Sequence, residues 1–103
     1  MVEELLKSGE RINQLFSTDI KIIQNREVFS YSVDSVLLSR FPRFPKNGLI
    51  VDFCAGNGAV GLFASSRTKA KILSVEIQER LADMAERSVR LNGLEEQMQV
   101  ICD

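Results

Sequence analysis

The chain's architecture follows from residues 48–61, which read Gly48-Leu49-Ile50-Val51-Asp52-Phe53-Cys54-Ala55-Gly56-Asn57-Gly58-Ala59-Val60-Gly61. The first half is a short apolar run after a glycine, and such a run predicts a buried strand. The second half contains three glycines in the spacing G-x-G-x-x-G. Apolar residues then continue at helical spacing, at positions 60, 63 and 64, so a helix is expected to pack back on the strand. The segment therefore predicts a strand, a glycine loop and a helix.

The three glycines are expected to have different roles. Gly56 and Gly58 suit a tight turn, because glycine reaches positive φ without strain and lets a ligand approach the backbone. Gly61 would allow the helix to pack closely against the strand. The same spacing also occurs in ordinary glycine turns, so the surrounding residues must decide whether the loop holds a nucleotide-type ligand.

Two acidic residues indicate which ligand that would be. Asp52 ends the first strand four residues before Gly56, at a place where a dinucleotide-binding loop is normally apolar. A carboxylate there suits a ligand with a cationic amine. Glu76 ends the next apolar run, residues 70–75, and lies 20 residues after Gly56, the spacing at which an acid accepts the hydroxyls of a ribose. The two acids predict an amino acid joined to a nucleoside, as in S-adenosylmethionine.

These motifs resemble a known family. The pattern D-x-x-x-G-x-G-x-x-G, followed by an acid after the second strand, resembles the Rossmann-like, class I methyltransferases. The Asn between the glycines, in Asp52 to Gly58, is similar to enzymes of that class that modify exocyclic or amide nitrogens. Upstream, Phe29-Ser30-Tyr31-Ser32-Val33-Asp34-Ser35-Val36-Leu37-Leu38 resembles the F-x-x-x-x-D-[AS]-x-L-L segment of the bacterial tRNA(Val) adenine-N6 methyltransferases. The resemblance covers about residues 12 to 103.

The resemblance implies an α/β fold, a Rossmann-like doubly wound sheet that is incomplete here. Strands 1 to 3 would lie in the order 3-2-1 with flanking helices, preceded by an N-terminal hairpin and helix. Residues 1–47 would form this extension, and residues 48–103 the first half of the cofactor-binding domain. The full fold has seven strands in the order 3-2-1-4-5-7-6, and the Asn-Pro-Pro-[Tyr or Phe] motif that grips the target amine is not in this sequence. We therefore expect no methyl transfer by the 103-residue chain alone.

The implied cofactor is S-adenosylmethionine or its product S-adenosylhomocysteine. Asp34 would contact the methionine end, and Asp103, with the neighbouring backbone, would recognise the adenine amine. No catalytic or metal-binding residue is expected in this chain. The cofactor-binding residues implied are Asp34, Asp52, Phe53, Cys54, Ala55, Gly56, Asn57, Gly58, Glu76, Ile77, Cys102 and Asp103.

The implied reaction is N6-methylation of an adenine in tRNA. A protein glutamine amide or a ribosomal RNA guanine are alternative acceptors, because the same Asn-Gly loop serves them. Two other classes stay open. An NAD-linked oxidoreductase shares the glycines and Glu76 but is opposed by Asp52. A half-fold without catalysis would be an interaction or RNA-binding module.

Composition sets further limits. The 103 residues are 45% apolar and 26% charged, which is typical of one small soluble domain. The net charge of −1 provides no general basic field, so tRNA would need a local patch. There is no histidine, which excludes His-based catalysis and most zinc sites. No signal peptide or membrane span is visible, so we expect a cytoplasmic protein without a membrane or metal partner. The unpaired edge of the first strand invites self-association.

The remaining segments carry weaker patterns. Residues 1–18 fit two short amphipathic pieces or one frayed helix, and residues 20–24 and 27–31 predict two strands around a polar turn. Residues 33–40 predict a helix and residues 41–48 a linker. Residues 78–92 predict a helix that buries Leu81, Met84, Ala85, Ser88 and Leu91 and turns Arg80, Glu86, Arg87 and Arg90 largely outward. Residues 98–103 predict a third strand. Cys54 and Cys102 are expected to be free thiols, because another strand separates theirs.

Overall fold

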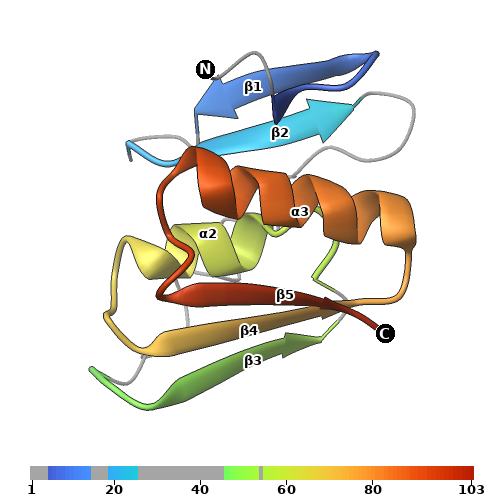
Figure 1. Cartoon of the computed structure of the whole chain (residues 1–103). Coiled ribbons are helices and arrows are strands. Elements are labelled where there is room, and N and C mark those ends of the chain that lie inside the picture. The colour runs from blue at the N-terminus through green and yellow to red at the C-terminus, as the bar shows by residue number, and fades with distance from the viewer. Residues whose placement is uncertain (1–4, 15–18, 26–45, 54) are drawn as a thin grey trace.

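The structure, a computed structural model, describes residues 5–14, 19–25, 46–53 and 55–103 (Figure 1). Its centre is a parallel three-stranded sheet in the order β3-β4-β5. Helix α2 connects β3 to β4, helix α3 connects β4 to β5, and both helices lie on one face of the sheet (Figure 1). The predicted strand, glycine loop and helix are confirmed. The bounds are β3 Leu49–Phe53, α2 Ala59–Ser65, β4 Lys71–Glu76, α3 Glu79–Leu91 and β5 Met98–Cys102.

The glycines behave as their positions predict. Gly56 and Gly58 have φ of 59° and 90°, in the left-handed region that favours glycine. At Gly61 an added Cβ would lie 2.8 Å from Met98 Cε and 3.0 Å from Ser74 Oγ. Any side chain at this position would force the end of Met98 or the Ser74 hydroxyl to move, so glycine suits the close approach of α2 to β4 and β5.

An antiparallel hairpin precedes this unit. It pairs β1 (Glu10–Gln14) with β2 (Lys21–Asn25). The predicted strand at residues 20–24 is confirmed as β2, but the helical interpretation of residues 1–18 is wrong for Glu10–Gln14. That segment has a single apolar residue, Ile12, so its strand comes from pairing with β2 rather than from its own pattern. The predicted elements at residues 27–31 and 33–40, and the linker up to residue 45, lie outside the described residues.

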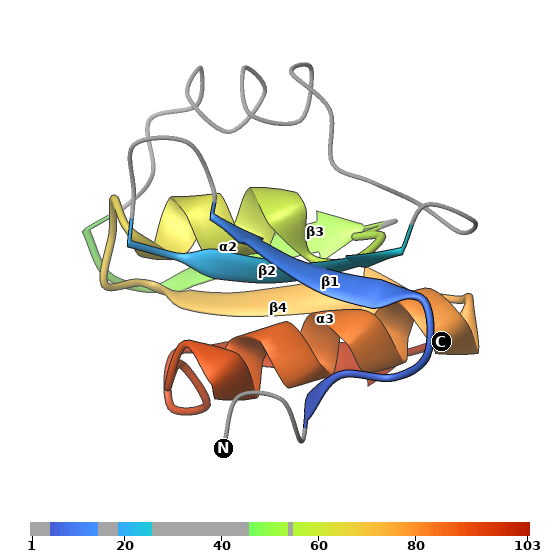
Figure 2. The ribbon, with the colours of Figure 1, turned by 90° about the horizontal axis from the view of Figure 1, so that it is seen from above.

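Strand β2 forms a third layer, on the side of the helices that faces away from the sheet (Figures 1 and 2). Its two central side chains point to different neighbours. Ile22 belongs to the apolar cluster that contains Leu62 and Phe63 of α2. Ile23 packs with Leu81 and Met84 of α3. Both isoleucines are completely buried, so β2 lies between the two helices and completes their packing.

Helix α3 is close to its predicted length. Gln78 and Asn92 are its caps, and Gly93 follows with a φ of 66°. Its predicted inner face is confirmed at Leu81, Met84, Ala85 and Ser88. The pattern is wrong for Arg87, which was predicted to point outward but is only 4% exposed. The hairpin covers the side of the helix that sequence periodicity assigned to water.

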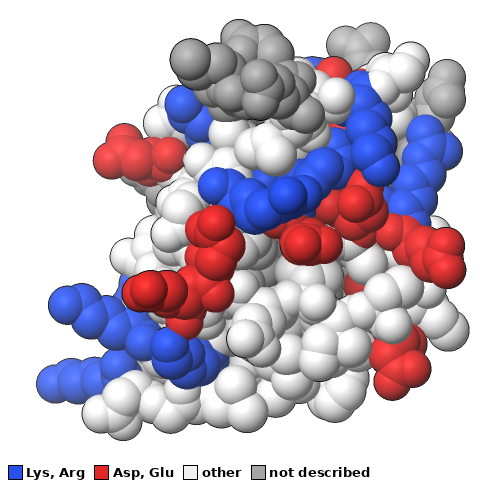
Figure 3. Space-filling model, viewed as in Figure 1, with Lys and Arg blue, Asp and Glu red and all other residues white. Residues whose placement is uncertain are grey.

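The face of the sheet opposite the helices is open and apolar. Leu49, Val51 and Phe53 alternate along β3 and are 61%, 41% and 74% exposed. Ile101 on β5 adds a fourth exposed apolar side chain. In the view of Figure 3, charged side chains gather around α3 and the hairpin, and a further group of Lys and Arg lies at the lower left. Strand β3 pairs only with β4, so its other edge has no neighbouring strand in the described part of the chain.

One of the two cysteines lies within the described residues. Cys102 is a free, exposed thiol, while Cys54 lies outside the described residues. The described ranges contain no group of three or more acidic, cysteine or histidine side chains that could hold a metal ion. In the same ranges, each helix is too short or too polar to cross a bilayer.

Candidate functional site

The carboxyl ends of the three parallel strands meet at one edge of the sheet (Figure 1). Phe53 lies beside Val75 in the register of β3 and β4, and Glu76 lies beside Cys102 in that of β4 and β5. The N–H of Asp103 donates to the carbonyl of Glu76 at 3.1 Å. This edge, with the glycine loop above it, therefore brings together predicted site residues from three separate parts of the sequence, as is typical of ligand sites in open α/β sheets.

Glu76 joins the glycine loop to the start of α3. Its Oε1 accepts the N–H of Gly56 at 2.8 Å, and its Oε2 accepts the N–H of Gln78 at 2.9 Å. The loop also donates the Ala55 N–H to the carbonyl of Val75 at 3.0 Å. The spacing of 20 residues noted in the sequence thus becomes a direct contact. Each carboxylate oxygen of Glu76 has a further lone pair with which to accept a hydroxyl of a ligand.

Asp52 carries an unsatisfied polar atom at this edge. Its Oδ2 is buried and has no hydrogen-bond partner among the described residues. Burial, and after it the charge of Glu76, raises the pKa of the Asp52 carboxyl. A buried carboxylate without a donor is unfavourable for folding, and a bound cation or amine would relieve it. Asp52 therefore has the properties of a recognition group for a positively charged part of a ligand.

Asn57 faces away from this edge, although it lies between the two loop glycines. Its side chain is fully buried, and Nδ2 donates to the backbone carbonyl of Ile23 in β2 at 3.3 Å. The structure therefore places Asn57 against the hairpin. Sequence reasoning missed this partner, because Ile23 lies 34 residues earlier and no local pattern links the two positions.

The other predicted site residues fall into two groups. Phe53 and Ile77 are 74% and 77% exposed, so each offers apolar surface at the carboxyl edge. Ala55 and Gly58 are buried in the loop itself. Asp34 and Cys54 lie outside the described residues, and their predicted contacts with the cofactor stay predictions.

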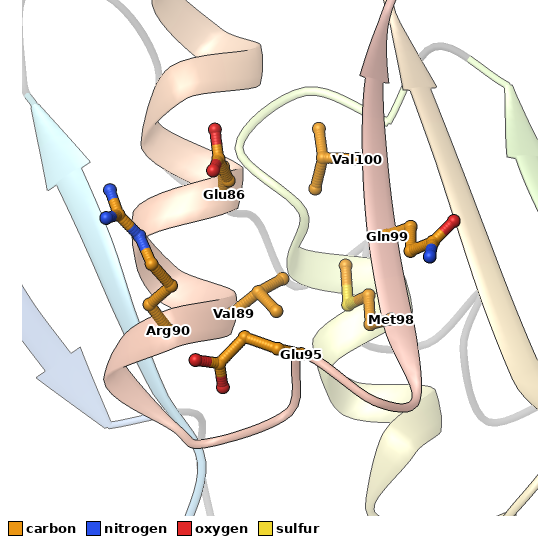
Figure 4. A pocket seen from close by; sticks show the side chains of 7 residues that line it. All are labelled: Glu86, Val89, Arg90, Glu95, Met98, Gln99 and Val100. Carbon is orange, nitrogen blue, oxygen red and sulfur yellow. The ribbon is translucent and has the colours of Figure 1, made fainter.

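A separate hollow of about 230 Å³ lies between α3 and β5 (Figure 4). It is lined by Val89, Met98 and Val100, with charged residues at its rim. None of the predicted site residues contributes to its lining. The glycine loop and the two acids, rather than this hollow, are therefore the candidate ligand site.

The sequence matches no protein-family model and no curated protein. Solved structures do share its fold. TYW2 from P. horikoshii, in complex with MeSAdo, superposes with a TM-score of 0.76 at 19% identity over 93% of this chain. A SAM-dependent methyltransferase from Agrobacterium tumefaciens gives 0.67 at 14% identity over 94%. The complex of aTrm5 with tRNALeu gives 0.67 at 14% identity over 92%.

These likenesses establish the fold, a Rossmann-like α/β unit of the kind found in SAM-dependent methyltransferases. The chain spans only about a third of the proteins it matches, namely 36% of TYW2, 33% of the Agrobacterium enzyme and 28% of aTrm5. More than nine-tenths of this chain is covered in each case.

Proposed function

We propose that this chain is the cofactor-binding portion of an S-adenosylmethionine-dependent methyltransferase. The observation that carries the proposal is the buried Oδ2 of Asp52 beside Glu76 and the glycine loop, which has no hydrogen-bond partner in the described part of the chain. The fold shared with a SAM-dependent methyltransferase, and with TYW2 bound to MeSAdo, supports it. A fold can serve many chemistries, so the argument rests mainly on the two acids.

The residues at the carboxyl edge fit the parts of this cofactor. Asp52 would accept the amine of the methionine moiety, and Glu76 would accept the ribose hydroxyls. Asp103 and the backbone of Cys102 would face the adenine. A dinucleotide fits less well, because the buried carboxylate of Asp52 would repel a pyrophosphate held at the same loop.

The bound cofactor would supply a methyl group already activated by its sulfonium. The residues of this chain would hold and orient it, which is catalysis by proximity and needs no general base here. The motif that grips the acceptor nitrogen is not in this sequence. We therefore propose that the 103-residue chain alone transfers no methyl group, and measurable turnover by it would contradict this.

The acceptor we propose is the N6 amine of an adenine in tRNA, which would place the protein in the cytoplasm. Support comes from the resemblance of residues 29–38 to the tRNA(Val) adenine-N6 methyltransferases and from the structural likeness to aTrm5, which binds tRNALeu. A protein glutamine or a ribosomal RNA guanine are the alternatives. Methylation assays with a methyltransferase that contains this chain would separate them, and activity on either alternative but not on tRNA would refute the adenine.

A calorimetric titration tests the cofactor. We expect the purified chain to bind S-adenosylhomocysteine and to show no binding of NAD at the same concentration, because only the former presents a cationic α-ammonium group to Asp52. Binding of NAD in preference to S-adenosylhomocysteine would favour the oxidoreductase. Binding of neither by a folded chain would favour a non-catalytic interaction module.

We also propose that the chain self-associates through β3. This strand has an unpaired edge in the described structure and three exposed apolar side chains on the open face. Sedimentation at increasing protein concentration is expected to show association that Val51→Lys abolishes, since a charge on the open face opposes its burial. Sedimentation of the unchanged chain as a monomer at every concentration would refute the proposal.

A further inference from the structure

The backbone of Ile23 in β2 is held from two sides. Its N–H donates to Ser88 Oγ of α3 at 2.9 Å, and its carbonyl accepts from Asn57 Nδ2 of the glycine loop at 3.3 Å. Ile23, Ser88 and Asn57 are all completely buried. Two side chains, one from a helix and one from the loop, thus satisfy the backbone of one strand residue.

The same pattern extends to Lys21. Its N–H donates to Asn92 Oδ1 at 2.7 Å, and its carbonyl accepts from Asn92 Nδ2 at 2.6 Å. Side chains therefore take the place of a neighbouring strand along this edge of β2. Three of these four hydrogen bonds come from α3 or its C-cap, and the fourth comes from the glycine loop.

The bond from Asn57 is the one with consequences for the candidate site. Gly56 and Gly58 on either side of it both have positive φ, in a region where glycine backbone has little conformational preference of its own. Nearby loop contacts reach β4, Glu76 or the loop itself. The bond from Asn57 instead reaches the hairpin, which belongs to a different sheet.

We propose that Asn57 is a positioning residue, which sets the shape of the glycine loop by anchoring it to β2 instead of touching the ligand. The inference rests on the proposed cofactor site and adds the hairpin to it as a structural support. Because coupling between two parts of a protein is reciprocal, a ligand that stabilises the loop is also expected to stabilise β2.

The pair Asn57→Ala and Ser88→Ala tests this proposal, since each variant removes one hydrogen bond from Ile23 and only the first touches the loop. The first measurement is amide hydrogen exchange at Gly56 and Gly58 without ligand. We expect Asn57→Ala to speed this exchange by about tenfold, the effect of losing one buried hydrogen bond. Ser88→Ala is expected to lower Tm and to leave exchange at the two glycines unchanged.

The second measurement is the affinity for S-adenosylhomocysteine. Asn57→Ala is expected to weaken binding about tenfold and Ser88→Ala to leave it unchanged. In the unchanged chain the ligand is expected to slow exchange at Ile23, and in Asn57→Ala this effect disappears. A direct ligand contact by Asn57 would weaken binding without changing glycine exchange in the free protein.

The two proposals fail in different ways. Equal glycine exchange in both variants and the unchanged chain would overturn the positioning role, whatever the ligand does. A chain that binds no S-adenosylhomocysteine would refute the proposed cofactor. Faster glycine exchange in Asn57→Ala alone would then still establish that Asn57 anchors the loop to β2.

Discussion

Replacing Asp52 with asparagine is expected to stabilise the fold and at the same time to weaken binding of S-adenosylhomocysteine. Asparagine has the same shape, but it carries no charge that must be buried beside Glu76. Loss of one partner from a desolvated charge pair typically weakens binding by about 2–5 kcal/mol, so we expect affinity to fall by roughly 30-fold or more. Calorimetry for the ligand and Tm for the free protein measure the two effects.

The stabilisation has a defined pH dependence. Burial and the charge of Glu76 raise the pKa of Asp52 in the folded chain, so the folded state binds a proton more readily than the unfolded state. Below the ordinary carboxyl pKa both states are neutral there, and the substitution has little effect. As pH rises through the raised pKa, the unchanged protein acquires the unfavourable charge. The gain in unfolding free energy from Asp52→Asn is therefore expected to grow as pH rises from the ordinary carboxyl pKa to the raised pKa of Asp52. Above the raised pKa the gain is expected to be constant.

Asp83→Asn is a matched control, because it makes the same chemical change at a carboxylate whose pKa is lowered rather than raised. Burial raises the pKa of Asp83, but hydrogen bonds and charges from Lys7 and Arg87 outweigh it and lower that pKa overall. Asp83→Asn is expected to destabilise the chain and to leave ligand affinity unchanged. Unchanged affinity in Asp52→Asn, or a lower Tm, would contradict the assignment of Asp52 as a ligand group.

The sheet and its loop could be predicted because their signals are local. Each strand is a short apolar run, and Gly56, Gly58 and Gly61 have conformational or packing roles that follow from the lack of a side chain. The acid Glu76 was also identified, since its spacing from Gly56 reflects the length of one strand-helix-strand crossover. These are features that a stretch of neighbouring residues determines.

The hairpin could not be predicted in the same way, because its stability comes from distant partners. Strand β1 is polar, and the carboxylate of its Glu10 pairs with Arg87, which lies 77 residues later in the chain. Helical periodicity places Arg87 outward, because the pattern of a single helix carries no information on a hairpin that covers the helix. Asn57 was interpreted as a ligand contact from its place in a motif, while its amide lies against β2.

Replacing Arg87 with methionine is expected to produce the largest loss of stability. Its guanidinium donates to both carboxylate oxygens of Glu10, to Asp83 Oδ2 at 3.0 Å and to the carbonyl of Leu5 at 2.6 Å. The side chains of Arg87 and Glu10 are only 5% and 3% exposed. Arg87→Met leaves the carboxylate of Glu10 buried without its partner, which typically costs about 3–5 kcal/mol, a large part of the stability of a small domain.

The double variant Arg87→Met with Glu10→Met distinguishes an unpaired charge from lost packing. Two apolar side chains of similar volume can replace a buried ion pair with little loss, so the double variant is expected to regain most of the free energy of unfolding in urea. A double variant no more stable than Arg87→Met alone would show that packing by the arginine, rather than the charge of Glu10, holds the hairpin.

Acid titration gives an independent check on the same pair. The hydrogen bonds from Arg87 hold the pKa of Glu10 below its usual value. Glu10 therefore contributes stability above the ordinary carboxyl pKa, and this contribution is lost as pH falls through the lowered value. The double variant has no Glu10 carboxylate to protonate. The unfolding free energy of the double variant is therefore expected to fall less steeply in acid than that of the unchanged protein. An identical acid dependence would mean that Glu10 is not charged against Arg87, and that the hairpin is held to α3 without this ion pair.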